Sequence, residues 1–156
     1  MPDVVDPQTR SRMMSGIRGK DTRPELVLRR ALHRLGFRYR LHVPSLPGKP
    51  DMVFPKQRAI IQVHGCFWHL HDCHLFKWPS SRVAFWRSKI TRNREKDAET
   101  FYALTHAGWR ILTVWECAFK GKTRRTEDEV VSYAADWLVS GSGNMTLQGR
   151  TDGRSC

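Results

Sequence analysis

The sequence predicts a small mixed α/β domain in which a β-sheet is flanked by helices. Helical and strand periodicities follow one another in the order helix, three strands, long helix, strand, helix, which favours a sheet packed between helices. The chain has 156 residues, of which 40% are hydrophobic and 10% aromatic, enough for one packed core. Its apolar runs are far shorter than the roughly 20 residues that a membrane span needs. We therefore expect one cytoplasmic domain without a membrane segment.

The first helix is expected to begin at Thr22, because threonine is a good N-cap residue. Pro24 fits the first turn, Glu25 can close a capping box, and Gly36 is a typical residue to end the helix. Alternating side chains and short apolar runs between turn residues predict the strands. The later elements are a strand over 37–43, a hairpin of strands over 51–54 and 59–63, a helix over 82–107, a strand over 109–115 and a helix over 125–139.

The two ends of the chain differ in composition from the middle. Residues 1–20 are polar and basic, and we expect an N-terminal arm or short helix that becomes ordered on a partner. Residues 140–156 are rich in Gly and Ser and almost without apolar side chains, which predicts a disordered tail with Cys156 as a bystander. The folded domain is therefore predicted to span 21–139.

The chain is strongly basic. Lys and Arg number 27 against 15 Asp and Glu, which gives a formal net charge of +12 with neutral histidines. Most of the basic residues are arginines, whose planar guanidinium group pairs bidentately with phosphate. A polyanion, most simply nucleic acid, is the expected partner. The alternative is an enzyme whose surface is basic for no such reason.

The segment 64–74 is unusually rich in metal-binding side chains, with four of the seven histidines and two of the four cysteines. Structural zinc takes four Cys or His ligands in a tetrahedral arrangement, usually as pairs that the fold brings together. Three ligands can come from this segment and the fourth from just after the strand over 109–115. His69 and His74 are alternatives to His71, and buried thiols with solvated histidines are the alternative to a metal. The predicted zinc ligands are Cys66, His71, Cys73 and Cys117.

A second metal centre is predicted at the hairpin. Asp51 opens one strand, and Gln62 and His64 end the other on one face, because side chains alternate along a strand. This is the arrangement of restriction-type nucleases, in which a carboxylate holds Mg²⁺ against the scissile phosphate and another group activates water. Asp51 fits the first role, and either His64 or His69 fits the second.

Two acidic residues share helix faces with apolar residues. Asp97 lies on the face of Ile90 and Leu104 in the helix over 82–107, where an unpaired carboxylate would be costly. We therefore expect Asp97 to have a partner: a histidine, an arginine or metal-bound water. Glu25 lies on the leucine face of the first helix, so it is either the capping-box residue or part of the site.

Five segments carry a set of motifs: Thr9–Met14, Thr22–Glu25, Leu46–Asp51, His64–Cys73 and Trp115–Cys117. Together they resemble the very-short-patch-repair (Vsr) mismatch endonucleases over about residues 9–137, and the run HGCFWH is the most specific part. The resemblance implies a restriction-endonuclease-like fold with a structural zinc. It also implies Mg²⁺-dependent nicking of duplex DNA on the 5′ side of the thymine in a T·G mismatch. Such mismatches arise when 5-methylcytosine is deaminated.

By position, the resemblance implies a role for each site residue. Asp51 matches the metal-binding aspartate, with the main-chain carbonyl of Val63 as second ligand, and His69 matches the catalytic histidine. Gln62 and His64 stand where the wider nuclease class carries an acid and a lysine, so its number of metal ions cannot be carried over. The residues matched around the metal-bound waters are Glu25, His64 and Asp97, and the matched zinc ligands are Cys66, His71, Cys73 and Cys117.

Mismatch recognition requires distortion of the DNA, which aromatic side chains wedged between bases can produce. Phe67 and Trp68 are the first candidates, and Met14 in the arm is a candidate minor-groove probe. Trp86 is either a further contact or a core residue. General mismatch-repair proteins are candidate partners, and a monomer fits the nicking of one strand. The alternatives are a restriction-type endonuclease for an unmismatched site and a zinc-stabilised DNA-binding module without catalysis.

Overall fold

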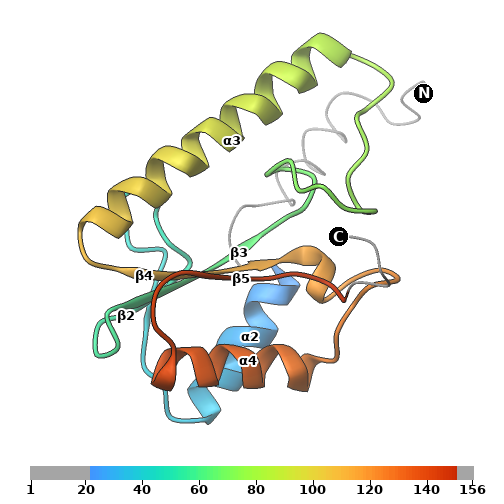
Figure 1. Ribbon diagram of the computed structural model, residues 1–156. Coiled ribbons are helices and arrows are strands. Elements are labelled where there is room, and N and C mark those ends of the chain that lie inside the picture. Colours follow the sequence, from blue (N-terminus) through green and yellow to red (C-terminus); the bar gives the residue numbers. More distant parts are fainter. Residues whose placement is uncertain (1–21, 151–156) are drawn as a thin grey trace, which may run out of the picture.

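A five-stranded sheet forms the centre of the computed structural model, which describes residues 22–150 (Figure 1). The strands are β1 (Arg40–Leu41), β2 (Met52–Phe54), β3 (Ala59–His64), β4 (Arg110–Trp115) and β5 (Met145–Leu147). The helices of the described part are α2 (Arg23–Arg34), α3 (Val83–His106) and α4 (Glu127–Ser140), with the short 3-10 helix η1 (Glu116–Ala118) after β4. The mixed α/β class is therefore as predicted.

The two halves of the sheet are connected differently. Strands β1, β2 and β3 pair antiparallel, and β2 and β3 form the predicted hairpin. Strands β3, β4 and β5 pair in parallel, joined through α3 and α4. His64 pairs with Trp115 where β3 and β4 end. In open sheets with parallel strands, ligands bind beyond this carboxyl edge.

Each face of the sheet has its own apolar core. Helices α2 and α4 cover one face, and α3 crosses the other (Figure 1). The core on the α2 and α4 side includes Leu28, Leu32, Phe54, Ile61, Leu112, Val130, Trp137 and Leu138. The smaller core joins Leu104 of α3 to Val53, Ile60 and Ile111. Because side chains alternate along β3, the face that carries Ile60 also carries Gln62 and His64, which places both under α3.

The start of α2 differs from the prediction in one respect. Thr22 is the N-cap in an extended conformation, but its side chain makes no capping hydrogen bond, so the reciprocal capping box is not formed. Glu25 is instead buried, with 1% of its surface exposed, and forms an ion pair with Arg29 at 3.0 Å. The capping-box interpretation of Glu25 is therefore wrong.

The strand expected over 37–43 is only two residues long, Arg40–Leu41. It ends at His42, whose φ of 46° is left-handed and turns the chain away from β2. The backbone N–H of His42 still donates to the Asp51 carbonyl at 3.2 Å, which closes the turn. The alternation over 37–43 predicts a strand, which the structure confirms only for Arg40–Leu41. The left-handed turn at His42 does not follow from this pattern.

The expected disorder from residue 140 onward is wrong for residues up to 150. Strand β5 pairs in parallel with β4, and Leu147 is buried. Asn144 accepts a hydrogen bond from the Ile111 N–H at 2.8 Å, which fixes the start of this pairing. A strand of three residues has too little apolar content to be detected from composition. Its order comes instead from pairing with the neighbouring strand. The arm over 1–20, with Met14, and Cys156 lie outside the described residues.

Candidate active site and metal clusters

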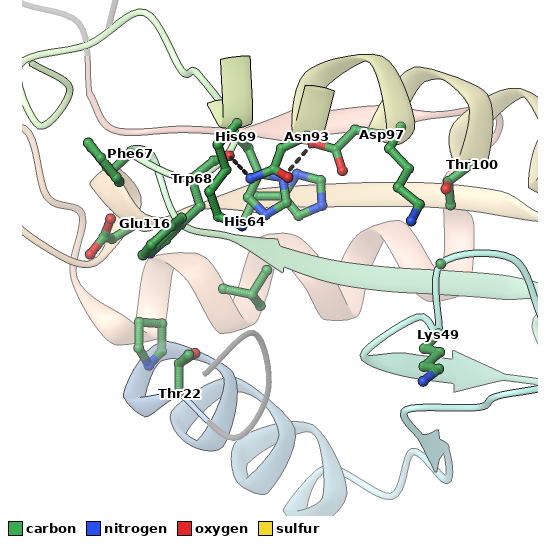
Figure 2. A pocket seen from close by; sticks show the side chains of 16 residues that line it. Thr22, Lys49, His64, Phe67, Trp68, His69, Asn93, Asp97, Thr100 and Glu116 are labelled. Carbon is green, nitrogen blue, oxygen red and sulfur yellow. Dashed lines mark hydrogen bonds and ion pairs between the residues drawn. The ribbon is translucent and has the colours of Figure 1, made fainter. Parts of the chain in front are cut away.

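A cavity of about 870 Å³ opens between the carboxyl end of β3 and helix α3 (Figure 2). Its lining joins imidazoles, two carboxylates, aromatic rings and ammonium groups: His64, His69, Asp97, Glu116, Phe67, Trp68, Lys49, Lys89 and Lys96. Ammonium groups around an opening suit a negatively charged substrate such as a phosphodiester backbone. The cavity therefore agrees with the net positive charge of the chain.

Two of the predicted catalytic residues are stacked on one another. The rings of His64, at the end of β3, and His69, in the loop that follows, have centroids 3.8 Å apart and planes 7° from parallel. His69 Nδ1 is hydrogen-bonded to the Asp97 carboxylate of α3 (Figure 2). The predicted partner of Asp97 is thus a histidine. With Nδ1 engaged, Nε2 is the nitrogen through which His69 can exchange a proton.

The environment of His64 keeps its ring neutral. Burial lowers the pKa of His64 well below its usual value, and the nearby imidazoles of His69 and His71 lower this pKa further. The ring also meets Trp115 edge-on, with centroids 5.3 Å apart. A neutral imidazole can hydrogen-bond water or substrate without adding a charge to the site.

An acidic cluster lies directly before β2. Asp51 is 8% exposed, and its Oδ2 accepts a hydrogen bond from the Val63 N–H at 2.8 Å. His42 lies between the two acids, with Nδ1 3.7 Å from Asp51 Oδ1 and Nε2 3.1 Å from Glu25 Oε2. The candidate ligand atoms of Glu25, His42 and Asp51 all lie within 4.8 Å of one another. The structure therefore brings the two predicted acids together around a histidine.

Sequence reasoning missed His42. The available signal was a histidine among the polar positions of the strand expected over 37–43, close in sequence to the predicted metal ligand Asp51. The acidic cluster does not itself line the cavity. The cluster and the cavity are connected by Val63, whose N–H donates to Asp51, and by Lys49, two residues before Asp51, because both residues line the cavity. The acids and the stacked histidines are thus neighbours on either side of the end of β3.

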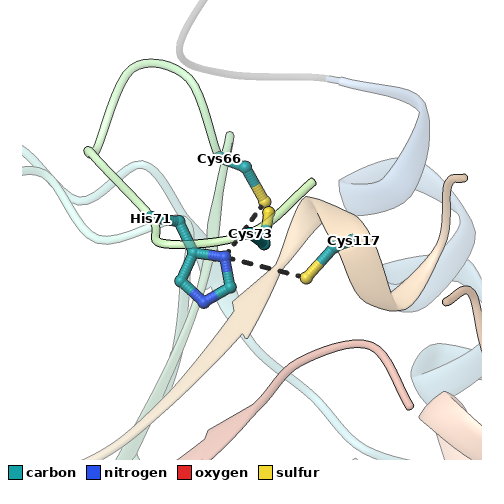
Figure 3. A group of neighbouring side chains, drawn as sticks. All are labelled: Cys66, His71, Cys73 and Cys117. Atoms are coloured by element: carbon teal, nitrogen blue, oxygen red, sulfur yellow. Dashed lines mark hydrogen bonds between the residues drawn. The ribbon is translucent and has the colours of Figure 1, made fainter. Parts of the chain in front are cut away.

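The four predicted zinc ligands meet at one point beside β4 (Figure 3). His71 Nδ1 lies 3.4 Å from Cys66 Sγ and 3.7 Å from Cys117 Sγ, and all four ligand atoms, with Cys73, lie within 4.8 Å of one another. Ligands about 2.0–2.3 Å from a tetrahedral metal lie about 3.5–3.8 Å apart, so the spacing fits zinc. The histidine here is His71, while His69 is used by Asp97.

The chemistry of the cysteines also fits a cation. Cys66 and Cys117 are fully buried. The pKa of the Cys66 thiol is raised above its usual value, mainly by a hydrogen bond with Cys117 and to a lesser extent by burial. Thiolates in this position therefore need a compensating positive charge, which a divalent metal supplies.

The segment after β5 adds two contacts to this Cys3His cluster. Gln148 Oε1 lies 3.0 Å from His71 Nε2, and the Gly149 N–H donates to Cys117 Sγ at 3.3 Å. Such contacts to the far side of a ligand fix its orientation. Both residues belong to the tail that composition predicted to be disordered, so sequence reasoning missed them.

The three aromatic residues predicted to contact DNA form one cluster beside the cavity. Phe67 meets Trp68 and Trp86 edge-on, with centroids 5.1 and 5.5 Å apart. Asn93 of α3 donates to the Trp68 carbonyl at 3.1 Å and so holds the loop against the helix (Figure 2). Trp86 is partly buried and packs against Phe67 and Trp68, which line the cavity, and it belongs to neither core.

A carboxylate and histidine site at the edge of a mixed sheet, beside a lysine-lined cavity, defines a protein of the nuclease class. The comparisons agree with this class, since the family model of the DNA mismatch endonuclease Vsr matches residues 2–75. The DNA mismatch endonuclease Vsr of Escherichia coli (strain K12) is 42% identical over 151 residues, 96% of this chain and 97% of that protein. This chain belongs to the family of Vsr DNA mismatch endonucleases and is itself an endonuclease.

Two further relatives are named as nicking enzymes. The type II nicking enzyme V.XorIIP of Xanthomonas oryzae pv. oryzae is 46% identical over 117 residues, 75% of this chain and 86% of that protein. The type II nicking enzyme V.NmeAIP of Neisseria meningitidis serogroup A is 39% identical over 122 residues, 78% of this chain and 87% of that protein. In residues 22–150, no helix is both long and apolar enough to cross a membrane.

Proposed function

We propose that this endonuclease nicks duplex DNA on the 5′ side of the thymine in a T·G mismatch, with Mg²⁺ as cofactor, and so initiates very short patch repair. The observation that carries the proposal is that Asp51 is hydrogen-bonded to Val63 near the end of β3, while the His69–Asp97 pair lines a cavity with lysines beyond that strand end. The relative named as a mismatch endonuclease supports the substrate, and those named as nicking enzymes support the reaction.

The surroundings of Asp51 suit a hard divalent cation. We assign its carboxylate and the main-chain carbonyl of Val63 as Mg²⁺ ligands, because Mg²⁺ prefers oxygen. A cation held there supplies charge stabilisation at the scissile phosphate. Glu25 and His64 are assigned as hydrogen-bonding partners of the waters around it. We also propose that the fold of this chain is restriction-endonuclease-like.

His69 is assigned as the residue that moves a proton. The Asp97 carboxylate holds Nδ1 and thereby orients the ring with Nε2 available for water or the leaving oxygen. Stacking on the neutral ring of His64 fixes the plane of His69. Lys49, Lys89 and Lys96 around the cavity are placed to neutralise backbone phosphates.

We assign a structural zinc to Cys66, His71, Cys73 and Cys117. It would tie the loop after β3 to η1 after β4, and structural zinc contributes about 10–16 kcal/mol in small peptides. This loop carries Phe67 and Trp68, which are proposed to wedge into the mismatched base step, with Trp86 behind them. Met14 as a minor-groove probe, action as a monomer in the cytoplasm, assistance by general mismatch-repair proteins and a domain start at residue 21 stay predictions.

Labelled duplexes test the substrate directly. A T·G duplex and the matched T·A duplex, in several sequence contexts, are incubated with the protein in Mg²⁺ and in EDTA. We expect a single nick 5′ of the mismatched thymine, only with Mg²⁺. Equal cleavage of T·A duplexes would favour the restriction-type endonuclease instead.

A further inference from the structure

We propose that His42 is a third protein ligand of the catalytic divalent cation, which gives the site an imidazole nitrogen and a preference for transition metals over Mg²⁺. The inference rests on the proposed function, in which Asp51 binds that cation. It begins with the position of His42, whose imidazole lies between Asp51 and Glu25 in the acidic cluster.

The two nitrogens of His42 have different partners. Nε2 lies 3.1 Å from Glu25 Oε2, a hydrogen-bond distance, whereas Nδ1 lies 3.7 Å from Asp51 Oδ1, which is longer than an N–H···O hydrogen bond. Two ligand atoms about 2.1 Å from one octahedral cation lie about 3 Å apart when adjacent and about 4 Å apart when opposite. The Nδ1–Oδ1 distance of 3.7 Å lies between these two values, so a small movement of either side chain brings both atoms to one cation. Nδ1 and Oδ1 are therefore placed to share a cation.

Glu25 completes a recurrent arrangement. Histidines that bind metals usually donate their second N–H to a carboxylate, which fixes the tautomer and the ring plane. Glu25 occupies that position toward Nε2, and it is held by Arg29 through the same oxygen at 3.0 Å. With Nε2–H donating to Glu25, the lone pair of His42 lies on Nδ1, toward Asp51. In this arrangement Glu25 also orients His42.

The backbone supports the same role. His42 adopts a φ of 46°, a left-handed conformation that is uncommon for a non-glycine residue. Such conformations cluster at active sites and ligand clamps. Here the turn brings the imidazole over the two acids, while the His42 N–H donates to the Asp51 carbonyl. An alternative is that His42 only clamps α2 to this turn.

The two roles make different predictions about metal choice. Mg²⁺ prefers oxygen ligands, whereas imidazole nitrogen favours transition metals. A nitrogen ligand at His42 should raise the affinity for Mn²⁺ and Co²⁺ relative to Mg²⁺. A clamp would change stability without changing that ratio.

Mn²⁺ binding to the full-length, zinc-loaded protein tests the inference without measuring activity. Mn²⁺ is titrated by electron paramagnetic resonance, and Mg²⁺ affinity is measured by competition. We expect His42→Gln to weaken Mn²⁺ binding about tenfold, in the range for perturbed metal-site histidines, and Mg²⁺ binding less than about threefold. His106→Gln, at an exposed histidine of α3, is the matched control and should bind both ions as the parent does.

Electron spin echo modulation then identifies the ligand. The Mn²⁺ adduct of the parent should show coupling to one imidazole nitrogen, which disappears in His42→Gln. His42→Asn serves as a second variant, and zinc content with thermal unfolding shows that both are folded. The coupling should persist in His69→Gln, because the His64, His69 and Asp97 group is a separate candidate metal site.

Three outcomes would overturn the inference in distinguishable ways. Nitrogen coupling that survives in folded His42→Gln and His42→Asn assigns the nitrogen elsewhere. A parent adduct without coupling, whose Mn²⁺ is lost in Asp51→Asn, leaves the proposed function standing and removes His42 alone. Unchanged Mn²⁺ binding in Asp51→Asn removes the metal site itself.

Discussion

His69 is hydrogen-bonded to Asp97 through Nδ1 while its ring stacks on His64, so a loop residue is fixed by a helix and a strand at the same time. A strand, the loop that follows it and a helix further along the chain thereby define the position of one imidazole. This arrangement fixes both the ring plane and the nitrogen that remains for chemistry.

Asp97→Asn should lower the rate of T·G nicking by about 10²–10⁴-fold, because an amide N–H facing Nδ1 favours the wrong tautomer of His69. Single-turnover kinetics with a labelled duplex measures the rate, and gel shift measures binding. Binding should persist, since loss of a negative charge does not weaken attraction to DNA. Glu95→Gln, at an exposed residue of the same helix, is the control. A folded Asp97→Asn protein that nicks at the parent rate would remove the dyad from the mechanism.

Cys117→Ser should give unstable protein with little bound zinc, because Cys117 is the ligand that joins the loop after β3 to the end of β4. Elemental analysis of the purified parent should find one zinc per chain, and a strong chelator should lower its melting temperature. Cys156→Ser, at the cysteine outside the ligand set, should match the parent. Folded parent protein without stoichiometric zinc would show that the ligand assignment is wrong.

Gln148→Ala should weaken zinc binding about tenfold, because it removes the contact to His71 Nε2 that orients this ligand. Competition with a chromophoric chelator measures the affinity. Met145→Ala changes an exposed residue of β5, three residues before Gln148, and should leave zinc affinity unchanged. Equal zinc affinity in Gln148→Ala and the parent would mean that the segment after β5 only rests on the cluster.

Trp68→Ala should weaken binding to T·G duplex about tenfold with less effect on T·A duplex, because a stacked base contributes about 1–3 kcal/mol. Fluorescence anisotropy with both duplexes measures the ratio. Tyr102→Ala, at an exposed aromatic residue of α3 away from the cluster, is the control. An equal loss on both duplexes would assign Trp68 to general DNA binding and not to the mismatch.

Local patterns predicted the elements that depend on local physics. The N-cap at Thr22, the hairpin and the long helix all lie within a residue or two of their expected places, because capping residues and periodicity act over a few residues. Strand β5 did not follow from such a pattern. Only Leu147 of this strand is buried, and its order comes from pairing with β4.

The metal clusters show the same division. The Cys3His set could be predicted, because few residue types bind zinc and the chain holds them at ligand spacing. The structure adds that His69 is hydrogen-bonded to Asp97, whereas His71 lies with the three cysteines. His42 could not be predicted. Its place depends on a left-handed turn that brings it to acids from two other parts of the chain.

The central claim is that Asp51 anchors the metal-dependent nicking of T·G mismatches, and Asp51→Asn tests it most directly. The variant is purified with full zinc content, and its binding to a labelled T·G duplex is matched to that of the parent before nicking is measured in Mg²⁺. The account predicts that binding persists and nicking is abolished, because the carboxylate that holds the cation at the scissile phosphate is gone. Nicking by the folded, zinc-loaded variant at close to the parent rate would contradict the account.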